Sequence, residues 1–143
     1  MEKGINQYIL EHFQIEEQDI KSYSPLTLAY IGDGIFDLVI RSIVVGKGNT
    51  SAHQLHRQTS KVVKAASQSA MIEKILPYLT KEEEAVYKRG RNAKSGTMAK
   101  NATMVDYRRA TGFEALMGYL YLQNDFPRII ELVEIGMEEH NEA

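Results

Sequence analysis

The segment PLTLAYIGDGIFDLVIRSIVV, residues 25–45, decides the fold, because nearly every position in it is apolar. A helix with apolar residues on all sides is typical of an element in the middle of a helical domain. Ser24 and Pro25 predict its first turn, since serine accepts hydrogen bonds from free amides and proline has no amide hydrogen to leave unpaired. Gly46 and Gly48 predict its end. We therefore expect a buried central helix around which the other elements pack.

Three charged residues interrupt this apolar segment. Asp33, Asp37 and Arg41 are four residues apart, so they lie along one stripe of the helix. Charge on a buried helix must face a partner, a metal ion or water, and we expect Asp37 to pair with Arg41. Gly32 and Gly34 flank Asp33, although each glycine destabilises a helix interior by about 1 kcal/mol relative to alanine. Another backbone is therefore expected to come close at this point.

The composition predicts one cytoplasmic domain, spanning residues 1–143. With 143 residues, 43% of them hydrophobic, the chain can bury a sizeable core. The absence of cysteine excludes disulfides and thiolate metal sites and fits a reducing compartment. The N-terminal residues lack the basic start and apolar run of a signal peptide. Charges break the best apolar stretch, so we expect no membrane span.

Charge is distributed unevenly along the chain, although the formal net charge is only −2. Residues 1–20 carry five acids and one lysine, and the segment from Glu131 onward has five glutamates with no lysine or arginine. Between Lys88 and Arg109, by contrast, seven cations accompany one acid, which gives a local charge of +6. A basic region in a mildly acidic protein predicts one surface that binds a polyanion.

Apolar periodicity predicts further helices on both sides of the central one. A capping box, Thr80 followed by Glu83, marks the start of one of them. No β-hairpin signal and no internal repeat is present, so the predicted fold is all-α. The expected helices span residues 5–13, residues 49 or 50 to 79 with a bend near 65–69, residues 81–88, residues 104–122, and the segment that follows Pro127.

The segment RGRNAKSGTMAKN, residues 89–101, has no apolar period, and we expect it to be an exposed loop. It lacks the spacing of a phosphate-binding loop, which argues against an NTPase. A solvated linker is one interpretation. Cations interleaved with neutral donors favour another, in which the segment contacts the phosphates of a nucleic acid. The candidate contacts are Lys88, Arg89, Arg91, Asn92, Lys94, Ser95, Thr97, Lys100 and Arg108.

Asp33 and Glu114 are the two carboxylates that stand inside apolar helical segments. Ionised acids are rarely buried without a partner, so each requires an explanation. If the two helices cross at their glycines, the carboxylates converge and form the kind of oxygen site that holds Mg²⁺. The glycines available for such a crossing are Gly32 and Gly34 on one helix, and Gly112 and Gly118 on the other.

Less specific interpretations of these residues remain open. Asp33 could form a structural ion pair with Arg41 or Arg108, because ion pairs also place acids in helices. His53 and His56 are three residues apart and could share a helix face. The sequence offers them no third ligand, so surface histidines are favoured over a zinc site.

Two motifs resemble a known family. LAYIGDGIFDLVIR, residues 28–41, resembles the signature helix of ribonuclease III catalytic domains, and TGFEALMGYLYL, residues 111–122, resembles their second acidic motif. With the basic RGRNAKSGT segment between them and the end of the chain soon after the last helix, the sequence is similar to the short bacterial form, Mini-ribonuclease III, which has no double-stranded-RNA-binding domain. The resemblance covers residues 24–139.

This resemblance implies an all-helical homodimer that cleaves double-stranded RNA and leaves 5′-phosphate ends. Asp33 and Glu114 would be its catalytic carboxylates and its ligands for Mg²⁺, for which Mn²⁺ could substitute, and the basic segment would contact the RNA. The implied substrate is the precursor of large-subunit (23S) ribosomal RNA, with a ribosomal protein as a further candidate partner. The larger enzymes have acids where this chain has Ala29 and Thr111, which favours a single Mg²⁺.

Two rival functions stay open beside the nuclease. One is a non-catalytic helical dimer that binds structured RNA, as a ribosome-assembly factor does. The other is an interaction module whose basic loop binds an acidic protein. Asp33 and Glu114 argue against both, because acids that face phosphate repel it unless a cation lies between them.

Overall fold

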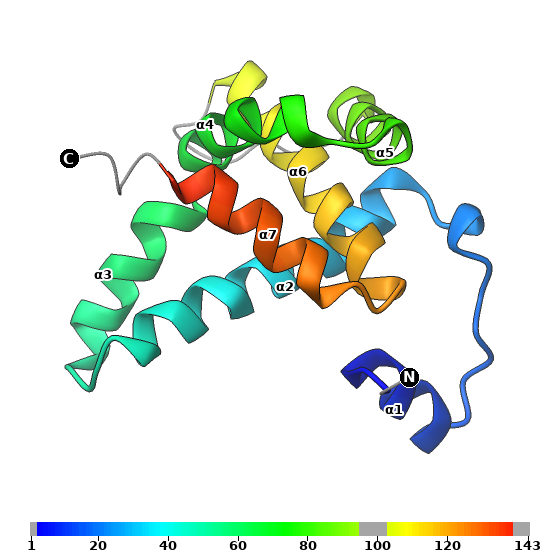
Figure 1. Ribbon diagram of the computed structural model, residues 1–143, viewed down its shortest axis with the longest axis horizontal. Coiled ribbons are helices and arrows are strands. Elements are labelled where there is room, and N and C mark those ends of the chain that lie inside the picture. Colours follow the sequence, from blue (N-terminus) through cyan, green and yellow to red (C-terminus); the bar gives the residue numbers. More distant parts are fainter. Residues whose placement is uncertain (1–2, 95–102, 139–143) are drawn as a thin grey trace.

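The computed structural model describes residues 3–94 and 103–138, and within these residues the chain forms helices and no strand (Figure 1). The all-α prediction is confirmed. The elements in chain order are α1 (Ile5–His12), η1 (Ile20–Ser22), α2 (Pro25–Gly46), α3 (Ala52–Val63), α4 (Ala65–Ile75), η2 (Leu76–Tyr78), α5 (Lys81–Asn92), α6 (Met104–Leu122) and α7 (Phe126–Met137).

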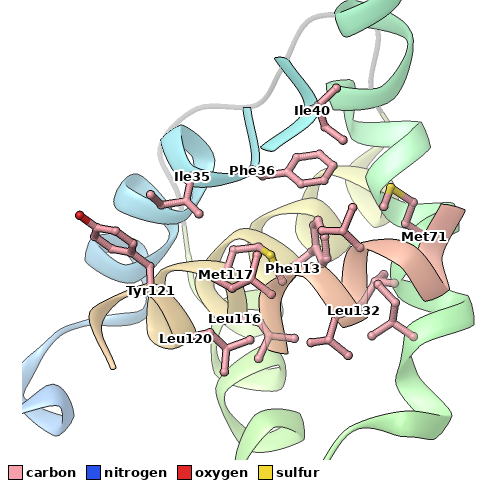
Figure 2. Close-up of a cluster of buried hydrophobic side chains, with 14 of the residues drawn as sticks. Ile35, Phe36, Ile40, Met71, Phe113, Leu116, Met117, Leu120, Tyr121 and Leu132 are labelled. Carbon is pink, nitrogen blue, oxygen red and sulfur yellow. The ribbon is translucent and has the colours of Figure 1, made fainter. Parts of the chain in front are cut away.

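Helix α6 lies at the centre of the bundle and packs against α2, α5, α4 and α7. Figure 1 shows α6 passing between α2 and the α4–α5 layer, with α7 beside it. The main core lies where α2, α4, α6 and α7 meet, and Figure 2 shows its side chains pointing toward one another. Phe36 and Phe113 stack edge to face there, with ring centroids 5.0 Å apart. The fold is thus organised around two helices, α2 and α6.

Two predicted helix starts, those of α2 and α5, are confirmed by their caps. The amide of Thr27 donates to Ser24 Oγ at 3.1 Å, and Pro25 is the first residue of α2. At the start of α5 the amide of Glu83 donates to Thr80 Oγ1 at 3.1 Å, while the amide of Thr80 donates to Glu83 Oε1 at 2.9 Å. Each cap satisfies amides that would otherwise lack a partner in the first helical turn.

Two predicted boundaries were wrong. Ser51, and not Asn49 or Thr50, caps α3, and the chain breaks at Lys64, just before the expected bend. Helix α5 continues to Asn92, so the start of the expected loop at Arg89 is helical. Gly90 permits this continuation because it lies against α6, where an added Cβ would be 2.9 Å from the Cα of Gly112. That glycine serves close packing and does not end the helix.

The expected close approach of α2 and α6 occurs at one glycine pair. A Cβ on Gly32 would lie 1.7 Å from the carbonyl oxygen of Glu114, and a Cβ on Gly118 would lie 2.0 Å from the carbonyl oxygen of Leu28. No side chain fits between backbones at such distances. Gly34 does not take part, because nothing lies within 4 Å of its Cβ position, and Gly112 lies against Tyr87 of α5 instead.

Helix α2 is buried on one side only, which corrects the expectation of a helix enclosed on all sides. Several of its large apolar side chains are exposed, and Tyr30 is 83% exposed. Helix α1 buries no residue, and its apolar side chains are exposed as well. Among the described residues, no helix is both long enough and apolar enough to cross a membrane. The exposed apolar residues of α2 are Leu26, Tyr30, Leu38 and Val45.

Candidate active site

The crossing of α2 and α6 brings Asp33 and Glu114 together. Gly32 precedes Asp33 in the chain, and the backbone atom it approaches most closely is the carbonyl oxygen of Glu114. The two carboxyl groups lie close enough for Asp33 to raise the pKa of Glu114. Asp33 lies on the exposed side of the pair and Glu114 is half-buried. The predicted convergence is confirmed, although Asp33 is not buried.

The acidity of Glu114 reflects this environment. Burial and the negative charge of Asp33 raise the pKa of Glu114 from 4.5 to about 8. Two neighbouring carboxylates resist full ionisation, because the second negative charge is repelled by the first. Near neutral pH the isolated pair therefore retains a proton, and a cation placed between the two acids would allow both to ionise.

Gln68 of α4 is the third side chain at this site. It is 2% exposed, and its Nε2 donates to Glu114 Oε2 at 3.3 Å and to the carbonyl oxygen of Val63 at 2.7 Å. The hydrogen bond from Gln68 opposes the rise in the pKa of Glu114. No sequence pattern pointed to this residue, because a neutral glutamine in an amphipathic helix is ordinary.

The structural ion pair considered for Asp33 does not form with Arg41. The Nε of Arg41 lies 2.7 Å from Asp37 Oδ2, as expected for residues four apart on a helix. Asp33 has Glu114 as its neighbour instead. His53 and His56 are exposed on α3, and the described residues contain no group of three or more His, Cys, Asp or Glu that could hold a metal ion.

The donor set fits one hydrated divalent cation. Mg²⁺ retains several waters and is held by one or two carboxylates, which Asp33 and Glu114 supply. Gln68 Oε1 is buried and has no hydrogen-bond partner among the described residues. A buried acceptor of this kind calls for a donor from outside the described residues, and the waters of a hydrated cation are such donors. The residues present are therefore better explained by a bound, hydrated cation than by a carboxylate pair that has neither a cation nor water beside it.

The predicted phosphate contacts divide between two helices and the segment that joins them. Lys88 and Arg89 are exposed on α5, and Lys88 Nζ lies 3.3 Å from Glu84 Oε1. Arg91 lies over the ring of Tyr87, 5.6 Å from its centroid, and donates to Asn92 Oδ1 at 3.3 Å. The remaining predicted contacts are Lys94, which is exposed, Arg108, which is exposed on α6, and Ser95, Thr97 and Lys100, which lie outside the described residues.

Arg109 differs from the other cations of this region. Its Nη1 lies 3.4 Å from Ser69 Oγ and 3.9 Å from Glu73 Oε2, so it faces α4. Arg109 therefore helps to join α6 to α4, whereas its neighbour Arg108 is directed to solvent.

A second basic segment escaped the sequence interpretation. Residues 38–72 contain no acid and five cations, and α3, which carries part of this charge, is largely exposed. The missing acids are a signal that was available in the sequence. The end of α3 also touches the carboxylate site indirectly, because Gln68 bonds both Val63 and Glu114. The five cations are Arg41, Lys47, Arg57, Lys61 and Lys64.

Comparison with known proteins places this site in a family. Residues 26–125 match the Ribonuclease III domain. The Mini-ribonuclease 3 of Clostridium tetani is 45% identical over 131 residues, which cover 91% of this chain and 87% of that protein. The Mini-ribonuclease 3 of Enterococcus faecalis is 48% identical over 118 residues, covering 81% and 89% of the two chains.

A solved structure agrees with these sequence relatives. The crystal structure of a protein from Fusobacterium nucleatum superimposes with a TM-score of 0.77 at 31% identity, and it covers 85% of this chain and 99% of that one. The paired carboxylates, the fold and the relatives all lead to one assignment. The chain belongs to the ribonuclease III family, within its Mini-ribonuclease 3 group, and is an RNA-cleaving endoribonuclease.

Proposed function

We propose that this endoribonuclease is Mg²⁺-dependent and specific for double-stranded RNA. It acts in the cytoplasm as a homodimer, and its substrate is the precursor of large-subunit (23S) ribosomal RNA. The observation that carries the metal dependence is the contact between Asp33 and Glu114, two acids that resist joint ionisation until a cation joins them. An RNA phosphate approaching these acids requires the same cation, since it adds further negative charge.

Asp33 and Glu114 hold the cation in this proposal. When bound, Mg²⁺ supplies Lewis-acid stabilisation of charge on the phosphate and lowers the pKa of a bound water. The protein orients the site from three helices, because Asp33 comes from α2, Glu114 from α6 and Gln68 from α4. The crossing at Gly32 and Gly118 fixes the separation of the first two helices, so the carboxyl groups need little rearrangement to bind the ion.

The exposed cations support a double-stranded substrate. A-form RNA is recognised mainly through its shape, its phosphates and its 2′-hydroxyls. A protein that binds duplex RNA therefore requires basic residues spread over a surface. Arg89 on α5 and Arg108 on α6 are exposed in this way, and so is Arg57 on α3. These residues position the backbone and carry little sequence information.

The exposed face of α2 supports the homodimer. Large apolar side chains on the helix that carries Asp33 are left uncovered, and an apolar patch of this kind on a soluble domain marks an interaction surface. A twofold dimer uses the same patch on both subunits, so one face is sufficient. The residues of this patch are Leu26, Tyr30, Leu38 and Val45.

Cleavage of a labelled RNA duplex tests the proposal. We expect the wild type to cut with Mg²⁺ and not with EDTA. Asp33→Asn and Glu114→Gln should lower the rate at least about a hundredfold while duplex binding persists, since a metal ion contributes several kcal/mol to the transition state. Asp37→Asn is the matched control, because that acid is one turn away and pairs with Arg41. Its rate should stay near that of the wild type.

The rival function is that of a non-catalytic RNA-binding assembly factor. It would be supported by a wild-type protein that binds the duplex but never cuts it with Mg²⁺ or Mn²⁺. Equal cleavage of single-stranded and duplex RNA would instead contradict the proposed specificity alone. Binding that falls steeply with salt is expected in every case, since phosphate contacts release counterions.

A further inference from the structure

Gln68 occupies a position in the site that neither motif of the sequence assigns. Its side chain is buried between α4 and α6, and its amide nitrogen faces two oxygen atoms, Glu114 Oε2 at 3.3 Å and the Val63 carbonyl at 2.7 Å. A carbonyl can only accept, so the nitrogen of the amide must be the atom that faces Val63. The orientation of the amide group, and with it the location of Oε1, follows from this contact.

The break between α3 and α4 creates this arrangement. Lys64 has extended backbone angles, φ −68° and ψ 156°. It is both the C-cap of α3 and the N-cap of α4. The Val63 carbonyl therefore lies at the end of α3, where carbonyls lack an intrahelical partner, and the side chain of Gln68 supplies one. Ser67 acts similarly on Lys61, whose carbonyl accepts from Ser67 Oγ at 2.6 Å.

One atom of Gln68 has no partner in the described protein. Oε1 is fully buried without a hydrogen bond. It is bonded to the same carbon as Nε2, so the contacts of Nε2 hold it beside the Glu114 carboxylate. A buried acceptor that lacks a donor costs free energy, so this group calls for a donor from outside the described residues.

We propose that Gln68 is the positioning residue of the cation site, with Nε2 fixing the Glu114 carboxylate and Oε1 accepting a hydrogen bond from a water of the hydrated Mg²⁺. This inference rests on the proposed metal dependence. It explains how two carboxylates suffice in this chain, which has Ala29 and Thr111 where the larger enzymes have acids. A neutral oxygen that binds a water of the ion takes over part of the role of those acids, and it adds no charge that would repel Asp33 or Glu114. Partners of this kind, one step removed from the ion, orient its ligands and tune its affinity.

Metal binding in the absence of RNA tests the role of Gln68. Mn²⁺ affinity, followed by electron paramagnetic resonance, and Mg²⁺ affinity, followed by calorimetry, should each fall at least about tenfold in Gln68→Met, which keeps the length of the side chain and removes both polar atoms. Ser67→Ala is the matched control, because it loses a hydrogen bond to the same helix end but touches neither carboxylate. Its affinity should stay within about twofold of the wild type.

The outcomes separate this inference from the proposed function. Wild type that neither binds Mn²⁺ nor cleaves duplex RNA would overturn both. Wild type that does both, with Gln68→Met binding Mn²⁺ equally well, would overturn only the role of Gln68. If Gln68→Met fails to fold by circular dichroism, Gln68→Asn replaces it, since the shorter amide cannot reach both partners. Affinity unchanged in a folded Gln68→Asn would overturn the inference in the same way.

Discussion

Asp33 and Glu114 show how a single site can oppose the stability of its own fold. Burial disfavours an ionised acid such as Glu114, and two acids in contact repel each other when both are ionised. The raised pKa of Glu114 expresses that cost, and the hydrogen bond from Gln68 reduces it only in part. A cation converts the same arrangement into a favourable one. In the metal-free protein, the carboxylate pair therefore lowers the stability of the fold at the position where the cation would bind.

Glu114→Gln should make the metal-free protein more stable at alkaline pH. The folded-state pKa of Glu114, about 8, lies above the unfolded value of 4.5, so the folded state holds the proton more tightly. The stability contributed by that proton is complete below pH 4.5 and is lost as the pH rises through 8. We expect the variant and the wild type to melt alike near pH 4.5, and the variant to melt about 2–6 °C higher above pH 8 in EDTA.

Calorimetric melts of both proteins across this pH range supply the measurement. Glu134→Gln is the control, because that acid is exposed on α7, away from the carboxylate pair. Added Mg²⁺ should stabilise the wild type at pH 8 and leave Glu114→Gln nearly unchanged. Melting curves for Glu114→Gln and the wild type that stay parallel at every pH would show that the pKa of Glu114 is not raised by folding.

Asp33 and Glu114 could be identified from the sequence, but Gln68 could not. Acids in apolar segments are conspicuous, because their burial needs a reason. A glutamine in a helix needs none, and its role depends on the break at Lys64 and on the distance to Glu114 across the bundle. Such contacts join residues 46 positions apart, so no local pattern records them.

The helices meet at glycines, and this feature was only partly visible in the sequence. Two glycines in α2 predicted a close approach, yet spacing alone could not distinguish Gly32, which touches α6, from Gly34, which touches nothing. Gly90 lies in a segment that we expected to be a loop but that is helical. The sequence does not distinguish a glycine that packs between helices from a glycine in a loop. The caps at Ser24 and Thr80 were predicted correctly, since a cap depends on residues a few positions apart, whereas the cap of α3 is Ser51 and not the predicted Asn49 or Thr50.

Gly32→Ala should disrupt both the fold and the site. The added Cβ would lie 1.7 Å from the Glu114 carbonyl, and a backbone in the middle of a helix cannot move aside cheaply. We expect a loss of about 3 kcal/mol or more in the free energy of unfolding. Gly46→Ala, at the open end of the same helix, has nothing within 4 Å and should be neutral or stabilising by about 0.5–1 kcal/mol.

Urea unfolding of both glycine variants measures these differences. The slope of the transition should be unchanged, since the surface exposed on unfolding is nearly the same. Duplex cleavage should fall in Gly32→Ala even below its melting temperature, because a displaced Glu114 misplaces the carboxylate pair. Equal stability of Gly32→Ala and wild type would show that α2 and α6 do not cross so closely.

At the scale of the molecule, the described part of the protomer leaves apolar side chains uncovered on the helix that carries Asp33. The apolar pattern of α2 suggested burial on every side, but the described residues cover only the sides of α2 that pack against α6, α3 and the rest of the core. A sequence pattern reports that a side chain avoids water and does not report whether its cover comes from the same chain or from another copy. Dimerisation was for this reason an expectation from resemblance and not from any residue pattern.

Tyr30→Glu should separate the proposed dimer into monomers. Tyr30 is 83% exposed on the uncovered face of α2, where a second copy would bury it, and a buried unpaired carboxylate is strongly disfavoured. We expect the dimer to weaken by at least about 2 kcal/mol, roughly thirtyfold in Kd, by sedimentation equilibrium. Tyr78→Glu is the matched control, because that tyrosine is 59% exposed on η2, outside this face, and its substitution should leave the dimer intact. A wild type that sediments as a monomer, or a Tyr30→Glu variant that dimerises as tightly as the wild type, would contradict the assignment of this face and leave its apolar side chains to be covered by a different partner.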